Sequence, residues 1–96
     1  MSDAKPLFHP GSIVITPGAE AAFKAEGASI TALIERHVSG DWGEEIADED
    51  RRFNNKGVNT GDRLLTAYTL PQTGTQLWVI TERNRSATTI MLPAEY

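Results

Sequence analysis

The sequence contains no cysteine, and this absence excludes disulfide bonds, thiolate zinc sites and cysteine nucleophiles together. No apolar run approaches the roughly 20 residues that a helix needs to cross a membrane. The first eleven residues hold one lysine and no apolar block, so they do not read as a secretory signal, and we expect a cytoplasmic protein. The chain also lacks a phosphate-binding P-loop, a dinucleotide-binding glycine fingerprint, a zinc-protease motif and a nucleophile elbow. We therefore expect no cofactor and no metal.

The composition is that of one small globular domain. The chain has 96 residues, of which 40% are hydrophobic and 23% charged. A chain of this length has one hydrophobic core. We expect a single domain over residues 1–96, in which residues 1–11 form a flexible N-terminal lead.

The charge is distributed unevenly along the chain, although the net charge is only −4. Residues 1–50 contain ten acids and three bases, whereas residues 51–96 contain six bases and three acids. Six of the acids fall within residues 41–50, where like charges repel unless a cationic partner relieves them. Two interpretations stay open: a solvated acidic turn, or a surface that meets a basic groove of another protein. Direct nucleic-acid binding is disfavoured, because the chain lacks a basic excess.

Two helices are predicted in the first half. Thr16 and Pro17 form an N-cap followed by a first helical residue, and Gly27 is a natural end for that helix. Ser29 caps a second helix whose apolar residues follow the spacing of one buried stripe: Ile30, Leu33, Ile34 and Val38. A third helix is predicted over residues 45–55, with Ile46 and Phe53 facing inward, and residues 54–62 then read as a loop.

The second half is rich in β-branched, aromatic and apolar residues. Three strands are predicted, over residues 63–70, 76–82 and 87–92, and their short connections favour an antiparallel meander. Residues 12–16 are a possible fourth strand. The predicted class is therefore α+β, with two to three N-terminal helices packed on a three- to four-stranded antiparallel sheet.

Two features at the end of the second predicted helix bear on chemistry. His37 and Asp41 supply two metal ligands without a clear third, so a structural histidine that caps carbonyls at the helix end is favoured over a metal site. Trp42 lies between Gly40 and Gly43, in a tight turn that either buries the ring under the sheet or presents it as a binding hot spot. His9 is expected on a loop without a role.

Residues 81–86, around the last predicted turn, form a polar cluster. A ribonuclease needs an acid or base and arginines that hold a phosphate. Two residues of other segments and three of this cluster are candidates for these roles: His37, Arg63, Glu82, Arg83 and Arg85. The simpler interpretation is a hairpin turn whose charged residues face water.

Three blocks of sequence carry a family resemblance: HVSGDWGE from His37, ITE with the following RS and TT pairs from Ile80, and LPAEY from Leu92. Together they resemble a family of short proteins of plasmids, phages and other mobile elements, mostly uncharacterised. Some members are labelled "type I restriction endonuclease subunit M". A methyltransferase subunit needs a cofactor-binding α/β domain, which these 96 residues do not hold. An acid often precedes the family's Arg-Ser pair, and Asn84 stands there in this chain.

The favoured functional prediction is a non-enzymatic binding protein of a mobile element. It would inhibit a host defence complex, of the anti-CRISPR or anti-restriction type, by entering the cationic groove that holds nucleic acid. The predicted partner-binding residues are Asp41, Trp42, Glu44, Glu45, Asp48, Glu49 and Asp50. One alternative is a small ribonuclease-like toxin with a helix-plus-meander fold. Another is a dimeric plasmid or phage accessory module, with a strand edge or the Trp78 face at its interface.

Overall fold

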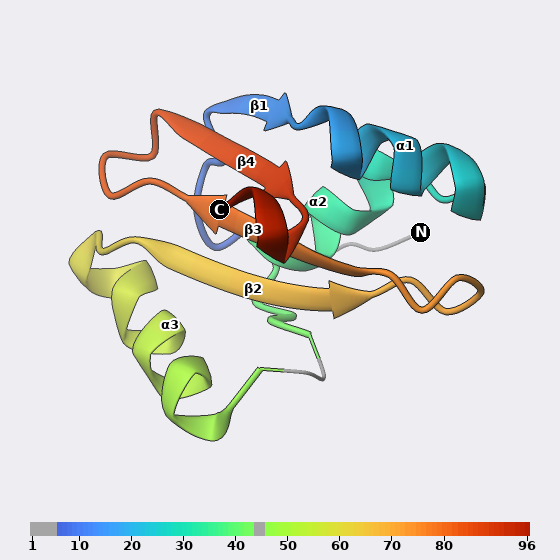
Figure 1. The fold of residues 1–96 in the computed structure, drawn as a ribbon. Coiled ribbons are helices and arrows are strands. Elements are labelled where there is room, and N and C mark those ends of the chain that lie inside the picture. The colour runs from blue at the N-terminus through green and yellow to red at the C-terminus, as the bar shows by residue number, and fades with distance from the viewer. Residues whose placement is uncertain (1–5, 44–45) are drawn as a thin grey trace.

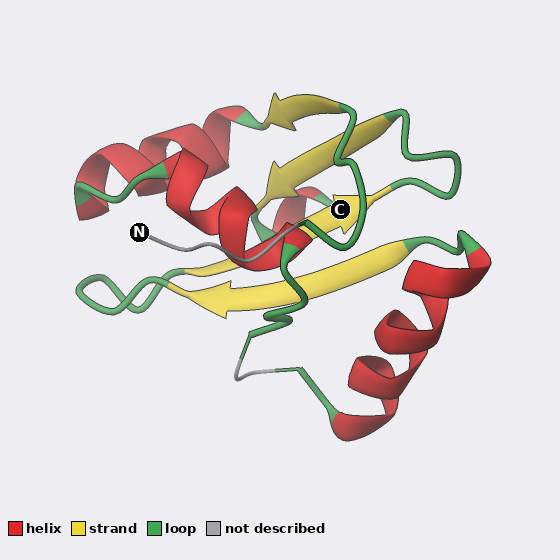
Figure 2. Ribbon diagram, turned by 180° about the vertical axis from the view of Figure 1, so that it is seen from behind, coloured by secondary structure: helices red, strands yellow, loops and turns green. Residues whose placement is uncertain are grey.

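The computed structural model describes residues 6–43 and 46–96. Its elements follow one another as β1 (Ser12–Ile15), α1 (Pro17–Glu26), α2 (Ile30–Val38), α3 (Asp48–Thr60), β2 (Leu64–Thr69), β3 (Gln76–Thr81), β4 (Ala87–Met91) and the 3₁₀ helix η1 (Pro93–Glu95). Helices α1 and α2 cover one face of the sheet, η1 lies on the other, and α3 lies beside β2 (Figures 1 and 2). The predicted α+β class is confirmed.

The sheet is mixed, with the strand order β1-β4-β3-β2. The meander of β2, β3 and β4 is antiparallel, as predicted. The prediction of an entirely antiparallel sheet is wrong for β1, which pairs parallel to β4. A long connection of helices and strands separates β1 from β4 in sequence, so no short turn dictates their relative direction. Their direction follows instead from packing.

Local signals place α1 and α2 where they were predicted. The Thr16 hydroxyl accepts a hydrogen bond from the Ala19 N–H at 3.2 Å, and Ser29 does the same for Ala32 at 3.1 Å. Each such cap satisfies one backbone donor that the first helical turn leaves unpaired. Gly27, at a φ of 70°, ends α1 in the left-handed conformation.

The hydrophobic core lies between the sheet and helices α1 and α2. Alternate residues of the strands point into it, as a sheet with one covered face requires. Its buried members are Ala19, Phe23, Leu33, Tyr68, Leu70, Leu77, Val79 and Ile90.

The prediction for α3 was wrong in its limits and in its inward face. The helix runs from Asp48 to Thr60, through the residues predicted to be a loop, and the Phe53 side chain is 58% exposed. The buried residue is Asn54, whose side-chain amide donates to the Leu65 carbonyl at 2.6 Å and accepts from the Leu65 N–H at 3.3 Å. A polar helix is thus held by hydrogen bonds to a strand, a contact that an apolar repeat does not reveal.

The described part of the N-terminal lead, residues 6–11, packs on the body of the protein. The Leu7 N–H donates to the Val38 carbonyl at 2.7 Å, and the Phe8 ring lies 5.2 Å from the His37 ring, centre to centre. The Pro10 carbonyl accepts from the Thr88 hydroxyl at 2.7 Å. The rest of the predicted flexible lead, residues 1–5, lies outside the described residues.

Candidate functional site

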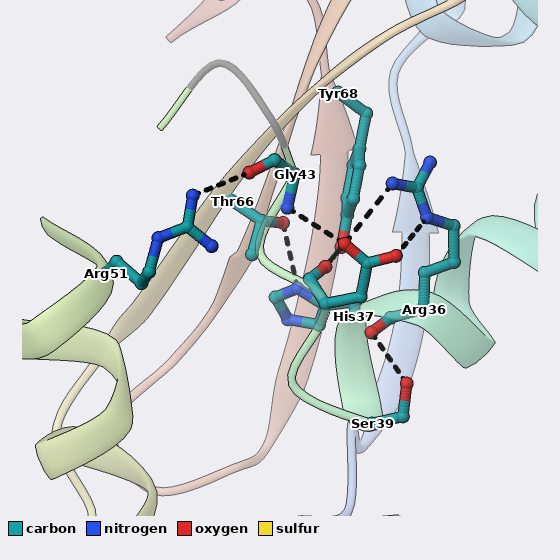
Figure 3. Close-up of polar contacts among 8 residues, drawn as sticks. Arg36, His37, Ser39, Gly43, Arg51, Thr66 and Tyr68 are labelled. Carbon is teal, nitrogen blue, oxygen red and sulfur yellow. Dashed lines mark hydrogen bonds and ion pairs between the residues drawn. The ribbon is translucent and has the colours of Figure 1, made fainter. Parts of the chain in front are cut away.

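The first of the predicted partner-binding residues, Asp41, lies in the turn after α2, and its partners Arg36 and Gly43 are labelled in Figure 3. Its carboxylate accepts from Arg36 Nε at 2.6 Å and from the Gly43 N–H at 3.2 Å. The hydrogen bond from Arg36 is the main reason that the pKa of Asp41 lies below its ordinary value. Asp41 is therefore ionised but already paired within the chain.

Trp42 does not lie on the surface, so its assignment as an exposed partner contact was wrong. Its side chain is 1% exposed, and the indole N–H donates to the Asn55 amide oxygen at 2.8 Å. The turn folds inward because Gly43, at a φ of 91°, lies where a Cβ would collide with the Ala67 carbonyl. The Tyr68 hydroxyl holds the same turn by donating to the Asp41 carbonyl at 2.5 Å. The ring of Trp42 is thus a buried plug.

The remaining predicted contacts lie at the start of α3. Asp48, Glu49 and Asp50 form its first turn, and all three are exposed. Among the residues described, no ion pair joins any of them to a cation. Arg51, the next residue, donates instead to the Gly43 carbonyl at 3.3 Å (Figure 3). The other two predicted contacts, Glu44 and Glu45, lie outside the described residues.

His37 is the centre of a buried chain of hydrogen bonds. Its Nδ1 lies 2.9 Å from the Thr66 hydroxyl, and its Nε2 lies 2.7 Å from the Thr81 hydroxyl. Thr81 contacts Thr88 at 2.8 Å, and Thr88 donates to the Pro10 carbonyl. Because a carbonyl only accepts, Thr88 receives its own hydrogen bond from Thr81 and Thr81 receives one from His37. The proton of the neutral ring therefore lies on Nε2, and the Thr66 hydroxyl, which also lies 3.3 Å from the Val79 carbonyl, donates to the closer Nδ1.

Burial keeps His37 uncharged. Loss of solvent is the main cause that lowers its pKa to about 3, and the positive charge of Arg85 contributes as well. The ring is neutral at physiological pH, fully buried, and hydrogen-bonded at both nitrogens. It has the properties of a structural histidine, but the predicted role as a cap of helix-end carbonyls was wrong, because both nitrogens bond to threonines of β2 and β3.

Arg85 is occupied by backbone carbonyls. Its guanidinium donates to the carbonyls of Asp62 at 2.6 Å, Gly57 at 2.9 Å and Glu82 at 3.2 Å. It also lies over the Phe8 ring, 5.4 Å from the ring centre. These contacts tie the β3–β4 turn to the end of α3, so the guanidinium is already committed to backbone acceptors.

The other residues predicted for the alternative ribonuclease site do not converge on His37. Arg63 lies 3.8 Å from the Glu82 carboxylate and donates to the Tyr96 hydroxyl at 2.9 Å. Arg83 is exposed in the β3–β4 turn. Only Arg85 is close enough to affect the pKa of His37. The described residues therefore do not assemble the acid, base and phosphate-holding groups of a ribonuclease around the histidine.

The structure also reveals an apolar pocket that sequence reasoning missed. It has a volume of about 540 Å³ and lies between the N-terminal segment, β1 and α2. Its lining includes Phe8, Pro10, Ile13, Ile30, Ile34 and Val38. The available signal in the sequence was the apolar stripe of α2, which supplies Ile30, Ile34 and Val38 to the lining.

Within residues 6–43 and 46–96, no three histidine or carboxylate side chains gather as metal ligands do. No helix there is long and apolar enough to cross a membrane. In comparisons with known proteins, the chain matches no protein family, no curated protein and no solved structure. The resemblance to short proteins of mobile elements therefore stays a prediction.

Proposed function

We propose that the protein is a non-enzymatic binding protein of a mobile element, which inhibits a host defence complex through the first turn of α3. The observation that carries the proposal is the exposure of Asp48, Glu49 and Asp50 without an ion-pair partner among the described residues. Three adjacent carboxylates outweigh the roughly half positive charge of a helix N-terminus. Such a surface is attracted to a groove that binds nucleic-acid phosphates.

The use of the other polar groups supports binding over catalysis. A general acid or base has to reach a substrate proton, whereas both nitrogens of His37 are hydrogen-bonded inside the protein. A phosphate-holding arginine needs free N–H groups, whereas Arg85 donates to three carbonyls. Within residues 6–43 and 46–96, no ion pair occupies the carboxylates of Asp48, Glu49 and Asp50.

The burial of Trp42 changes the form of the proposal. Without an exposed aromatic anchor, the contact depends on charge more than on a hydrophobic hot spot. Charge complementarity speeds association and selects partners, and its effect falls as salt increases. We therefore expect inhibition that weakens steeply with ionic strength.

The test is an inhibition assay against purified CRISPR effector complexes and restriction enzymes, with DNA cleavage as the readout. The double variant Asp48→Asn/Glu49→Gln is compared with Glu20→Gln/Glu35→Gln, which removes the same charge from exposed sites on α1 and α2. We expect the first variant to weaken inhibition at least about tenfold and the second to change it less than about twofold. Equal effects of the two variants would show that only net charge matters. No inhibition of any complex by the wild-type protein would overturn the proposal.

A further inference from the structure

The two edge strands of the sheet differ in what lies beside them. Along β2, the Asn54 side chain occupies the outward N–H and carbonyl of Leu65. Along β1, the only strand paired among the described residues is β4, on the inner side. The side chains of Ile13 and Val14 are 44% and 46% exposed, and β1 carries no charged residue. Natural edge strands usually carry charges, bulges or covers that prevent pairing with another chain, and β1 has none of these on its four residues.

The pairing of β1 with β4 determines which backbone N–H and carbonyl groups of β1 are free. The N–H groups of Ser12 and Thr16 donate to the β4-side carbonyls of Ser86 and Ile90, each at 3.0 Å. Backbone groups alternate in direction along a strand, so the even-numbered residues of β1 face β4. The N–H and carbonyl groups of Ile13 and Ile15 consequently point away from the sheet.

We propose that a second copy of this chain pairs with β1 in antiparallel orientation, with the two-fold axis at Val14. In this register Ile13 of each copy exchanges both backbone hydrogen bonds with Ile15 of the other. The neighbouring symmetric registers use fewer groups. Self-pairing of Ile15 sets Ile13 opposite Pro17, which has no N–H, and self-pairing of Ile13 sets Ile15 opposite Gly11, whose φ of 70° is not that of a strand.

The side chains suit the same register. Ile13 and Ile15 face the helix-covered side of the sheet, in line with Thr88 and Ile90, so the two copies would bring four isoleucines together there. On the other side, Val14 would meet its own counterpart. Ile13 also lines the apolar pocket, so the second copy would lie next to that pocket. Each surface is complementary to itself, as a two-fold interface requires.

Charge also favours two antiparallel copies. The N-terminal end of β1 adjoins the β3–β4 turn, which carries the exposed Arg83, because Ser12 bonds to Ser86. The C-terminal end adjoins Glu95, whose carboxylate stays ionised because hydrogen bonds from Thr16 and from backbone N–H groups lower its pKa. Antiparallel pairing sets the basic end of one copy against the acidic end of the other. The interface is independent of the acidic turn of α3, which lies beyond the opposite edge of the sheet (Figure 1).

The absence of cysteine allows a direct test by a single Val14→Cys substitution. At the two-fold axis the two Cα atoms would be about 4.5 Å apart, within the range that a disulfide bridges. Mild oxidation is expected to convert this variant to a covalent dimer on a non-reducing gel. Phe53→Cys, at an exposed position on α3, is the matched control and is expected to run as a monomer on the same denaturing gel, because its thiols lie away from the interface.

Sedimentation analysis supplies the second, independent measurement. The wild-type protein is expected to sediment as a dimer. Ile13→Lys is expected to raise the dissociation constant of the dimer at least about tenfold, because it places a charge on the β1 edge of each copy. Leu65→Lys, on the other edge strand, is expected to leave the dimer unchanged. A wild-type monomer at high concentration, a dimer that survives Ile13→Lys, or cross-linking of Val14→Cys no faster than that of Phe53→Cys would each overturn the proposal.

Discussion

The β2 edge of the sheet is covered and the β1 edge is open, although both are built from mainly uncharged residues. At β2, the amide of Asn54 bonds to Leu65 as the backbone of a neighbouring strand would. At β1, the comparable groups of Ile13 and Ile15 face outward from the sheet. The difference shows that a polar side chain of a helix can occupy the outward groups of an edge residue as a neighbouring strand would, whereas Ile13 and Ile15 keep theirs available to another chain.

The same comparison explains the composition of α3. A helix that covers a sheet face needs an apolar stripe, whereas one that covers a strand edge needs hydrogen-bonding side chains. Residues such as Asn54 and Asn55, which read as loop residues in the sequence, serve as partners for Leu65 and Trp42. Arg85 supports the arrangement from the other end by binding the Gly57 carbonyl.

Opening the covered edge is expected to have the largest effect. Asn54→Leu keeps the size of the side chain but leaves the N–H and carbonyl of Leu65 without partners, which is expected to reduce the free energy of unfolding by about 2–4 kcal/mol. Asn59→Leu, at an exposed position of the same helix, is the control and is expected to change it by less than about 0.5 kcal/mol. Urea unfolding measures both, and equal midpoints for the two variants would contradict the edge-covering role of Asn54.

Acid is expected to lower the free energy of unfolding through His37, which joins α2 to β2 and β3 on the helix-covered face of the sheet. The folded protein binds a proton at this ring only near pH 3, whereas the unfolded chain does so near pH 6.5. The stabilisation is therefore complete above pH 6.5 and is lost as the pH falls toward 3. Between pH 6.5 and 4.5, before most carboxylates titrate, the loss is expected to reach about 2–3 kcal/mol.

The measurement is urea unfolding at several pH values for the wild type and for His37→Gln. The variant is expected to be less stable at neutral pH, because its shorter side chain does not span Thr66 and Thr81, but to lack the slope between pH 6.5 and 4.5. Parallel curves for the two proteins would show that another group carries the pH dependence.

Loosening the C-terminal end of α3 is expected to have a smaller effect. Arg85→Lys keeps the charge but does not reproduce the forked contacts with the carbonyls of Asp62, Gly57 and Glu82. We expect the free energy of unfolding to fall by about 1–3 kcal/mol and amide exchange in the last turn of α3 to become faster. Arg83→Lys, in the same turn but exposed, is expected to be neutral. A loss of similar size in both variants would argue against the contacts of Arg85 as the cause.

The smallest expected effect is at the open edge. Ile13→Lys breaks no hydrogen bond to β4, so the free energy of unfolding of the monomer is expected to change by less than about 0.5 kcal/mol. Thermal unfolding at low protein concentration measures this. A large loss of monomer stability would mean that Ile13 supports the fold of its own chain, and the β1 edge would then differ less from the β2 edge.

The predictions made from sequence succeeded where the stabilising partner is a near neighbour in the chain. Thr16 and Ser29 bond three residues ahead, so the starts of α1 and α2 were predictable. Short connections predicted the antiparallel meander of β2, β3 and β4. The limits of α3 were not predictable, because the residue that holds its buried side, Leu65, belongs to a strand that follows the helix.

The candidate site divides in the same way. The acidic run 48–50 was visible as a surface feature, and its exposure agrees with the strong hydration of carboxylates. The inward position of Trp42 was not visible, since it depends on the approach of Gly43 to Ala67 of a distant strand. The partners of His37 and Arg85 were hidden for the same reason.

The amino-acid sequence alone determined the α+β class, the two capped helices, the antiparallel meander and the uneven charge, because each arises from residues close together in the chain. Tertiary packing alone set the parallel direction of β1, the extent of α3, the neutral state of His37 and the contrast between the two sheet edges. These features depend on hydrogen bonds and burial between residues far apart in the chain, and such contacts exist only once the sheet and its helices have come together.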